Sequence, residues 1–265
     1  MVENASGDDS AARIRQWAVS NGVSCGAGPG DWLVLLEAPR NGGYAAGNNI
    51  GLDWIANAGD ASHVWVLNPD TLVTPTALTE MVARMADDPA IGTCGALVCE
   101  MEEPGLVQCY AGGTFNRWIA RSVDLGLGMS CQQPVDRDAV EGRLGYVVGA
   151  CVLVSRAFLA AAGPMDERFF LYYEEIAWQR AAGSRFRLGF APGAVIYHNR
   201  HSSGGLQERY LFANRLRFAR WYQPWSLPLV TFGLIGTAIR ALTRANWPRA
   251  RLILSPGFWR LGLFG

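Results

Sequence analysis

Short apolar runs, each bounded by turn residues, recur along the first 200 residues of the chain. Runs of this length are typical of buried strands, and four are found: Trp32–Leu36, His63–Leu67, Ile91–Val98 and Val147–Val154. Between them, apolar residues recur at helical spacing, which predicts helices over residues 10–20, over residues 44–57 and from Pro75 onward behind a capping Thr74. This alternation predicts an α/β fold, a mostly parallel sheet flanked by helices.

Two segments depart from the alternation. Residues 100–145 are Gly-rich and irregular, as expected for an insertion that shapes a substrate site. A basic helix is predicted over residues 206–222, and the uncharged run Trp225–Ile239 that follows is shorter than the about 20 residues that a bilayer crossing needs. The sequence therefore predicts an α/β domain over residues 1–200 and a helical C-terminal region over residues 201–265.

The composition is half apolar and 17% charged, which suits a globular enzyme with a sizeable core. The formal net charge is zero, but it is unevenly distributed. Residues 200–265 hold ten Arg and one acidic residue, whereas residues 1–199 hold thirteen Arg and twenty-two acidic residues. A basic, aromatic tail indicates an anionic partner, either a membrane surface or nucleic acid. The tail has no recognisable nucleic-acid module and its aromatic residues flank an apolar run, so we expect peripheral membrane contact and no nucleic acid.

The six cysteines lie in apolar or Gly-rich surroundings, and none forms a Cys-x-x-Cys pair. We interpret them as buried, reduced thiols, with zinc binding and disulfides as the alternatives. The polar segment Glu3–Asp9 stands where a signal peptide would need its apolar core. The expected location is therefore the cytoplasm, with the C-terminal region on the inner face of the cell membrane.

Two motifs carry the more specific chemistry. Asn68-Pro69-Asp70-Thr71 follows a predicted strand, at the edge where open α/β sheets bind ligands. A carboxylate there can hold Mg²⁺ or Mn²⁺ against a diphosphate, although an Asp that only opens a turn fits the same position. Glu174 and Glu175 stand among aromatic residues, and low local polarity would raise their pKa values as a general base requires. The alternative is a helix N-terminus stabilised by two acidic residues.

Two further motifs are weaker. Glu3-Asn4-Ala5-Ser6 is a polar, turn-forming segment before a predicted helix. The segment 41–49, Asn-Gly-Gly-Tyr-Ala-Ala-Gly-Asn-Asn, sets small residues at a helix start, where a phosphate or ribose can approach backbone N–H groups. Taken alone, each motif is more usually explained by ordinary capping and turn chemistry.

Taken in order, these motifs resemble family 2 glycosyltransferases, in particular the rhamnosyltransferase-like members. The family pattern is Asp-Asn-Ala-Ser, Asn-x-Gly-x-x-x-Gly-x-Asn, Asn-Pro-Asp, Gly-Ala-x-x-Leu-x-x-Arg, Asp-Glu-x-Phe-Phe-x-Tyr-x-Glu-Asp and a late His, and the likeness covers residues 2–200. The resemblance implies a GT-A fold, a divalent metal (Mn²⁺ or Mg²⁺) and a role in polysaccharide biosynthesis. The implied reaction is inverting transfer of a sugar, with rhamnose favoured, from a nucleotide-diphosphate donor to a hydroxyl of a glycan or lipid-linked acceptor.

The resemblance also implies roles for individual residues. Glu175 corresponds to the catalytic base and Asp70 to the metal ligand, with His198 as a second contact to the metal or the diphosphate. The acceptor would be bordered by Gly149, Ala150 and Glu174. The nucleotide sugar would contact a larger set: Glu3, Asn4, Asn41, Gly47, Asn48, Asn49 and Asn68.

The chain departs from the family pattern at single positions. Glu3 and Glu175 replace Asp, each adding one methylene of reach, and Ala177 stands where the family has a further Asp. These changes imply altered geometry or weakened activity. The alternative function is therefore a catalytically degenerate, truncated relative that binds a membrane or a protein partner.

Family members also carry an apolar strand and a helix before the first motif. That strand lies between the strands that here end near Asn4 and near Asp70. We therefore expect an α/β sheet that lacks the usual first strand and helix, with interrupted pairing beside Val64–Leu67, because neighbours of a missing strand lose their ladder partner.

Overall fold

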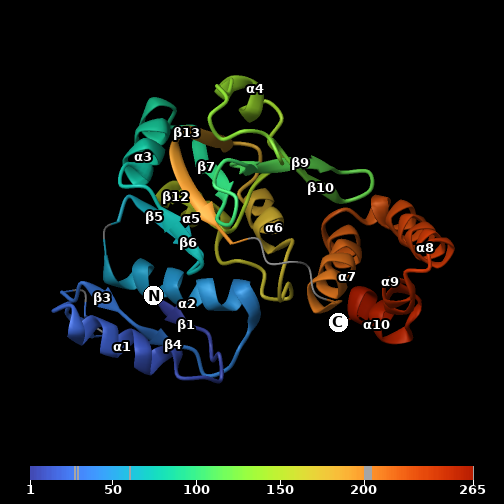
Figure 1. Cartoon of the computed structure of the whole chain (residues 1–265), viewed down its shortest axis with the longest axis horizontal. Coiled ribbons are helices and arrows are strands. Elements are labelled where there is room, and N and C mark those ends of the chain that lie inside the picture. Colours follow the sequence, from blue (N-terminus) through green and yellow to red (C-terminus); the bar gives the residue numbers. More distant parts are fainter. Residues whose placement is uncertain (27, 29, 60, 200–204, 265) are drawn as a thin grey trace.

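The centre of the protein is a nine-stranded sheet, shown in Figure 1. The computed structural model describes residues 1–26, 28, 30–59, 61–199 and 205–264. The sheet contains β5 (His63–Leu67), β6 (Thr71–Val73), β7 (Ile91–Glu100), β8 (Val107–Tyr110), β9 (Gly112–Asn116), β10 (Arg121–Asp124), β11 (Tyr146–Val147), β12 (Cys151–Ser155) and β13 (Arg187–His198). Its main path is β10-β9-β8-β7-β12-β5, with β13 paired to β7 and β6, and β11 paired to β9.

The sheet is mixed, which corrects the expectation of a mostly parallel one. β7 and β13 pair in parallel, whereas β12 lies antiparallel between β5 and β7. β5, β7 and β13 therefore run in one direction, as a helical crossover between β5 and β7 requires. β12 follows the long 100–145 insertion instead of a single helix, so no crossover fixes its direction.

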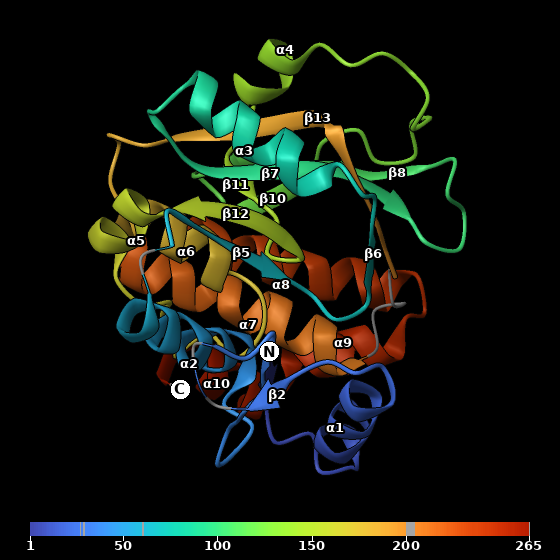
Figure 2. The same ribbon diagram turned by 90° about the vertical axis from the view of Figure 1, so that its left-hand side faces the viewer.

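Helices cover both faces of the sheet, as Figure 2 shows. The flanking helices are α2 (Gly43–Ala58), α3 (Ala77–Asp87), α5 (Arg156–Ala162) and α6 (Glu174–Ala181), and a short α4 (Arg137–Glu141) lies in the insertion. Alternate residues of β12 face two cores: Leu153 packs with Met81 of α3, and Val152 packs with Trp178 of α6. The α/β expectation is thereby confirmed as a three-layer arrangement.

The 100–145 insertion is regular, although an irregular segment was expected. It contributes β8, the β9–β10 hairpin and α4. Two of its glycines are required by close backbone packing, since a Cβ on Gly112 or Gly113 would collide with the carbonyl oxygens of Tyr146 and Val123. These two glycines therefore mark a crowded part of the sheet.

The N-terminal segment forms a separate unit below α2 in Figure 1. Its elements are β1 (Val2–Glu3), α1 (Ser10–Ser20), β2 (Cys25–Gly26), β3 (Leu33–Val34) and β4 (Leu36–Glu37). β1 pairs with β4 and β2 with β3, in two parallel two-stranded sheets. Among the described residues β5 has β12 as its only ladder partner, so β5 forms one edge of the sheet.

The C-terminal helices pack against α6 and the β9–β10 hairpin (Figure 1). They are α7 (Gly205–Tyr222), the 3₁₀ turn η1 (Pro224–Ser226), α8 (Leu227–Thr243), α9 (Trp247–Leu254) and α10 (Pro256–Phe264). One buried cluster joins Tyr173 and Ile176 to Leu216 of α7 and Val230 of α8. The helical region therefore shares a core with the α/β domain, and the boundary expected between residues 200 and 201 lies outside the described residues.

The apolar C-terminal segment is longer than its uncharged run suggested. Pro224–Thr243 has 20 residues, with a mean hydropathy of 1.4 in its most apolar 18-residue window. By length and composition alone this is enough to cross a membrane, which corrects the expectation of a run too short to do so. In the fold, 28% of the window is buried. Val230 and Leu234 face the protein, whereas Phe232 and Ile239 are exposed.

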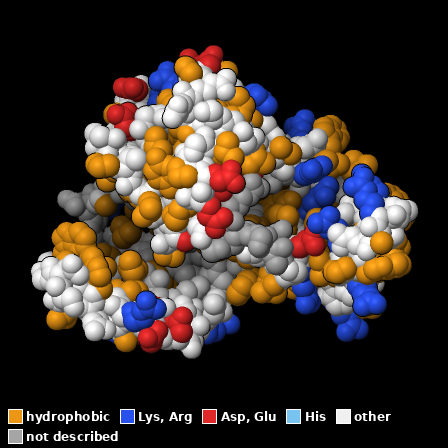
Figure 3. Space-filling model, viewed as in Figure 1, with side chains coloured by type: hydrophobic (Ala, Val, Ile, Leu, Met, Phe, Trp, Pro, Cys, Tyr) orange, Lys and Arg blue, Asp and Glu red, His pale blue; other side chains and the backbone are white. Residues whose placement is uncertain are grey.

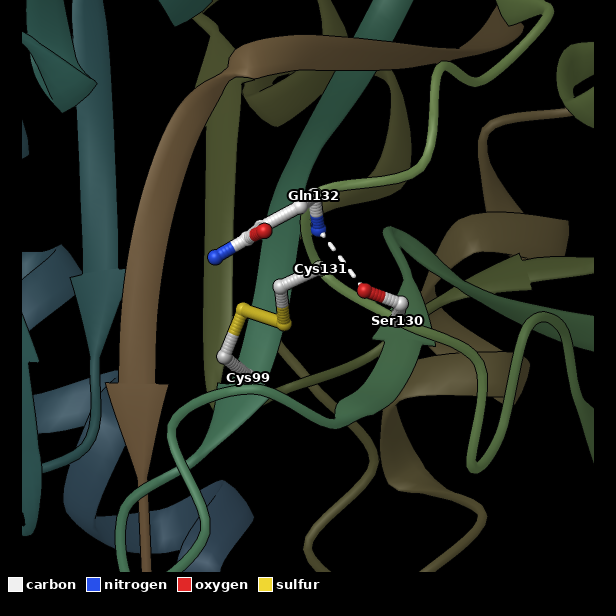
Figure 4. Close-up of a disulfide and its surroundings, with 4 residues drawn as sticks. All are labelled: Cys99, Ser130, Cys131 and Gln132. Atoms are coloured by element: carbon white, nitrogen blue, oxygen red, sulfur yellow. Dashed lines mark hydrogen bonds between the residues drawn. A yellow bond between two sulfur atoms is a disulfide. The ribbon is translucent and has the colours of Figure 1, made fainter.

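Two of the six cysteines form a disulfide, which corrects their interpretation as reduced thiols. Cys99, near the end of β7, is bonded to Cys131 in the loop after β10 (Figure 4). In the same loop the Gln132 backbone N–H donates to the Ser130 hydroxyl (3.2 Å). The pairing could not be read from spacing, because the β7–β8 hairpin and the loop bring together cysteines 32 residues apart.

Candidate active site

A carboxylate pair opens α6. Glu174 and Glu175 form its first turn, where the helix dipole favours negative charge. The chain enters the helix through Tyr172 (φ 69°) and Tyr173 (φ 75°), two consecutive non-glycine residues in the left-handed region. Such conformations are costly and persist where the surrounding structure enforces them, often at functional sites.

Contacts from two distant elements enforce this entry. Asn214, fully buried in α7, donates through Nδ2 to the carbonyl oxygens of Leu171 (2.7 Å) and Tyr172 (3.1 Å). The Tyr173 hydroxyl donates to the Ala120 carbonyl (2.6 Å) at the β9–β10 turn. The C-terminal helices and the insertion therefore position the carboxylate pair.

The two carboxyls are poorly solvated. Glu174 is 4% exposed, and the Oε2 atom of each Glu is buried without a hydrogen-bond partner among the described residues. Burial, reinforced by the neighbouring Glu175, raises the pKa of Glu174 well above its usual range. Burial likewise raises the pKa of Glu175, against opposing backbone hydrogen bonds. Buried acceptor atoms without donors suit a ligand that brings hydroxyl groups.

Asp70 and His198 lie together at the end of β5. β6 pairs antiparallel with the end of β13, with Thr71 opposite His198. This register sets the His198 Nε2 atom 3.4 Å from Asp70 Oδ1. The ring is oriented from its other side, where Nδ1 lies 2.8 Å from Gln108 Oε1. The structure thus joins two residues that are 128 positions apart in the sequence.

Gln108 and Glu100 belong to the same group, and the sequence did not indicate them. Gln108 Nε2 donates to Glu100 Oε2 at 3.5 Å, so the polar chain runs from Asp70 through His198 to Glu100. Gln108 reaches the site through the pairing of β7 with β8. No local motif marks that pairing, so no signal in the sequence could have identified it.

The donor set fits a divalent cation that is shared with a substrate. Asp70 supplies a carboxylate oxygen and His198 an imidazole nitrogen. Within the described part of the chain, no group of three or more His, Cys, Asp and Glu side chains is placed to hold a metal. Mg²⁺ and similar ions bind through one or two protein carboxylates together with substrate phosphates and water. The pair therefore suits a cation completed by a diphosphate.

The first two motifs meet at the start of α2. Asn4 Nδ2 donates to the Gly43 carbonyl (2.8 Å) and to Asn41 Oδ1 (3.4 Å), and Asn41 Oδ1 also accepts from the Gly43 N–H (3.0 Å). Asn4 Oδ1 is buried without a partner among the described residues. A Cβ on Gly47 would stand 3.0 Å from Asn4 Nδ2, a tight contact that would require the Asn4 amide to shift.

Two other residues expected to contact the nucleotide sugar make hydrogen bonds within the protein instead. Glu3 accepts from the backbone N–H groups of Ala5 (3.2 Å) and Ser6 (2.7 Å), and the bonds from Ser6 lower the pKa of Glu3. Asn48 Nδ2 donates to the Tyr44 carbonyl (2.9 Å). These side chains shape the turn and the helix that border the site.

Asn49 is turned away from this group. It is buried, donates to the Met165 carbonyl (3.0 Å) and to Glu167 Oε1 (2.9 Å), and accepts from the Met165 N–H (2.8 Å). These bonds join α2 to the segment before α6. Its position in the motif is thus explained by packing, and we do not propose it as a ligand contact.

The expected acceptor residues connect the other groups. The Asn68 N–H donates to the Ala150 carbonyl (3.0 Å), which links the Asp70 motif to the Gly149–Ala150 turn. The Tyr44 hydroxyl donates to the Gly149 carbonyl (2.6 Å). Burial, together with the charges of Glu174 and Glu175, raises the pKa of Tyr44 well above its usual range. The start of α2, the end of β5 and the start of α6 therefore border one site.

Comparisons with known proteins show which proteins this chain is similar to. No family model matches the chain. It is 25% identical over 189 residues to an N-acetylglucosaminyl-diphospho-decaprenol L-rhamnosyltransferase of Mycobacterium tuberculosis, covering 64% of this chain and 60% of that protein. It is 24% identical over 200 residues to the low-salt glycan biosynthesis hexosyltransferase Agl10 of Haloferax volcanii, covering 72% of this chain and 57% of that protein. The chain thus spans about 60% of the length of the first of these curated relatives.

Solved structures share the fold at low sequence identity. GalNAc-T7 with UDP, GalNAc and Mn²⁺ has a TM-score of 0.57 and 14% identity, covering 83% of this chain and 40% of that chain. The mannosyltransferase PcManGT of Pyrobaculum calidifontis with GDP-Man and Mn²⁺ has a TM-score of 0.50 and 16% identity, covering 98% of this chain and 72% of that chain. The GT-A fold expected from the motifs is confirmed. In sequence the chain is similar to curated rhamnosyl- and hexosyltransferases, in agreement with the resemblance that the motifs indicated.

Proposed function

We propose that the protein is an inverting glycosyltransferase that moves a sugar from a nucleotide-diphosphate donor to an acceptor hydroxyl. The observation that carries the proposal is the single site that joins a buried carboxylate pair to the Asp70–His198 pair. The rhamnosyl- and hexosyltransferase names of the curated relatives support the same reaction class. The first of those names favours rhamnose as the sugar.

Glu175 is the proposed base. Its raised pKa and its unpartnered Oε2 suit it to take the proton of an acceptor hydroxyl as that oxygen bonds to the sugar carbon. The bond from the sugar to the diphosphate breaks in the same step, with inversion at carbon. Glu174, the other carboxyl, would orient the acceptor, and Gly149 and Ala150 would border it.

Asp70 and His198 are the proposed holders of Mn²⁺ or Mg²⁺ at the diphosphate. Such a cation supplies charge stabilisation for the departing diphosphate when it is bound. On the nucleotide side, the free acceptor atom Asn4 Oδ1 would receive a donor group of the ligand, with Asn41 and Gly47 alongside. The backbone of Asn68 fixes the turn between the two groups.

A screen of nucleotide sugars with Mn²⁺ tests the proposal. We expect one donor to be hydrolysed or transferred, and its nucleoside diphosphate to raise the melting temperature in the presence of Mn²⁺, because ligand binding stabilises the folded state. The competing function, a degenerate relative that binds a membrane or partner, predicts neither turnover nor stabilisation.

We also propose that the protein lies on the inner face of the cytoplasmic membrane without crossing it. One face of α8 packs on the protein, while Leu229, Phe232 and Ile239 on the other face are exposed. The ten arginines after residue 199 supply charge for anionic headgroups. A lipid-linked acceptor would reach the site along such a surface.

Vesicle flotation tests the membrane contact. We expect the protein to float with anionic vesicles at low salt and to lose that binding when Phe232 and Ile239 are both changed to Asp, because apolar burial drives interfacial binding. The matched control changes Leu78, an exposed apolar residue of α3, to Asp. Equal flotation of the double variant and the control would contradict the proposal.

A further inference from the structure

Four arginines surround the turn of the β9–β10 hairpin. They are Arg117, Arg121, Arg180 and Arg215, here called the arginine cluster. Among the described residues, none of them has a carboxylate within salt-bridge distance, whereas arginines elsewhere, such as Arg84 and Arg168, are paired with Glu or Asp. Figure 3 shows basic side chains gathered where the hairpin faces the C-terminal helices.

The cluster is held in place by rings and by neutral polar groups. The Arg180 guanidinium carbon lies 4.5 Å from the Phe115 ring centroid, and this side chain also faces the Gln223 side-chain amide. Arg215 Nε donates to the Ile119 carbonyl (2.8 Å). A guanidinium has five N–H donors, so both side chains keep donors for a ligand.

The positive charges of the cluster are close enough to affect one another. Partial desolvation, with a further contribution from Arg117, lowers the pKa of Arg180. Desolvation also lowers the pKa of Arg215, and Arg121 adds to that decrease. Like charges held together without a counter-charge destabilise the protein, and a bound anion would remove that cost. The cluster is therefore suited to an anionic group.

The cluster lies between the carboxylate pair and an exposed apolar surface. Arg180 stands on α6 five residues after Glu175, and Tyr173 is within electrostatic reach of Glu175, Arg121 and Arg215. On the other side, Trp118 of the hairpin contacts Trp225 of η1 edge to face, with ring centroids 5.0 Å apart. Both tryptophans are at least half exposed, and the surface continues along α8 to Phe232, which is 71% exposed.

We propose that the arginine cluster binds the diphosphate of a lipid-linked acceptor whose hydrocarbon chain lies on Trp118, Trp225 and the exposed face of α8. The carboxylate pair, the arginine cluster and the apolar surface follow one another in this order. The sugar, the diphosphate and the hydrocarbon chain of the acceptor follow one another in the same order, so the acceptor sugar would reach Glu175. This inference rests on the proposed transferase function and names the chemical class of its acceptor.

Acceptor kinetics test the proposal. The two probes are N-acetylglucosamine joined through a diphosphate to a short prenyl chain, and the same sugar as an alkyl glycoside without phosphate. Charge-assisted hydrogen bonds contribute enough that the diphosphate probe should have a kcat/KM about 100-fold higher. In the double variant Arg121→Gln and Arg180→Gln, we expect the KM for that probe to rise about 10- to 100-fold, with an unchanged KM for the nucleotide sugar.

A matched control is available on the same stretch of chain. Arg185 also stacks on a ring, with its guanidinium carbon 4.9 Å from the Phe186 centroid, but it lies beyond the far end of α6. Arg185→Gln should leave both KM values unchanged. Equal use of the two probes, or an unchanged acceptor KM in the double variant, would overturn the proposal.

A binding measurement separates this inference from the proposed function. Titration of the prenyl-diphosphate probe without any donor should show binding that the double variant loses, even if no sugar transfer is found. The same titration is repeated with inorganic pyrophosphate as the ligand. Binding of pyrophosphate as tight as that of the probe would assign the cluster to a free anion and overturn the lipid-linked acceptor.

Discussion

Replacing Glu175 with Gln is expected to lower kcat by about 100- to 10,000-fold while sparing donor binding, because general-base catalysis contributes in this range. Gln keeps the size and the hydrogen-bonding ability of the side chain but cannot accept the proton. Single-turnover transfer and donor titration would be measured on the same preparation. Full turnover in the Gln variant would contradict the assignment of Glu175.

Glu174 provides the matched control, since it stands in the same helical turn and is also buried. If it orients the acceptor and does not take the proton, Glu174→Gln should mainly raise the acceptor KM and reduce kcat far less than Glu175→Gln does. The reverse order of kcat losses would transfer the role of base to Glu174.

The pH dependence provides an independent test of the base. Burial raises the pKa of Glu175 to about 7, and only the ionised form accepts a proton, so kcat should fall as the pH decreases through about 7. A raised pKa in the folded state also means that the fold binds this proton more tightly than the unfolded chain does. Stability contributed by Glu175 is therefore lost as the pH rises toward 7, and Glu175→Gln should be the more heat-stable protein at pH 8.

Replacing Asp70 with Asn is expected to remove the Mn²⁺ dependence of donor binding. The carboxylate supplies the negative charge of the Asp70–His198 pair, and its loss should raise the Kd of the nucleoside diphosphate about 100-fold with Mn²⁺ present. Binding measured in EDTA should not change, because the nucleotide contacts remain. Calorimetric titration with and without Mn²⁺ measures both values.

A neutralised carboxylate elsewhere controls for net charge. Asp87, exposed at the end of α3, can be changed to Asn without touching the site. We expect that variant to retain the full Mn²⁺ effect. Mn²⁺-enhanced binding in Asp70→Asn that equals the effect in this control would contradict a metal at Asp70.

Helices and strands that have a clear hydrophobic pattern of their own were predicted from the sequence. The helix expected over residues 10–20 is α1, Ser10–Ser20, and the strand expected over His63–Leu67 is β5. The proximity of Asp70 and His198 also followed from the sequence, because both stand at the ends of strands in the family pattern.

Features that depend on long-range pairing were missed. The direction of β12, the hairpin in the insertion and the Cys99–Cys131 bond arise from contacts between distant segments. Gln108 reaches His198 only through strand register, and the arginine cluster combines residues of β10, α6 and α7 with one from the hairpin turn. These arrangements cannot be predicted from any short stretch of the sequence, because they involve residues that are far apart in the chain.

The bonds from Asn214 to the loop before Glu174 have a consequence for protein synthesis. The ribosome makes α6 before α7, so the left-handed backbone at Tyr172 and Tyr173 lacks these bonds while the chain is still growing. A nascent chain would therefore carry both glutamates without holding them in place. If the protein has the proposed transferase activity, sugar transfer should begin only after α7 has left the ribosome and packed.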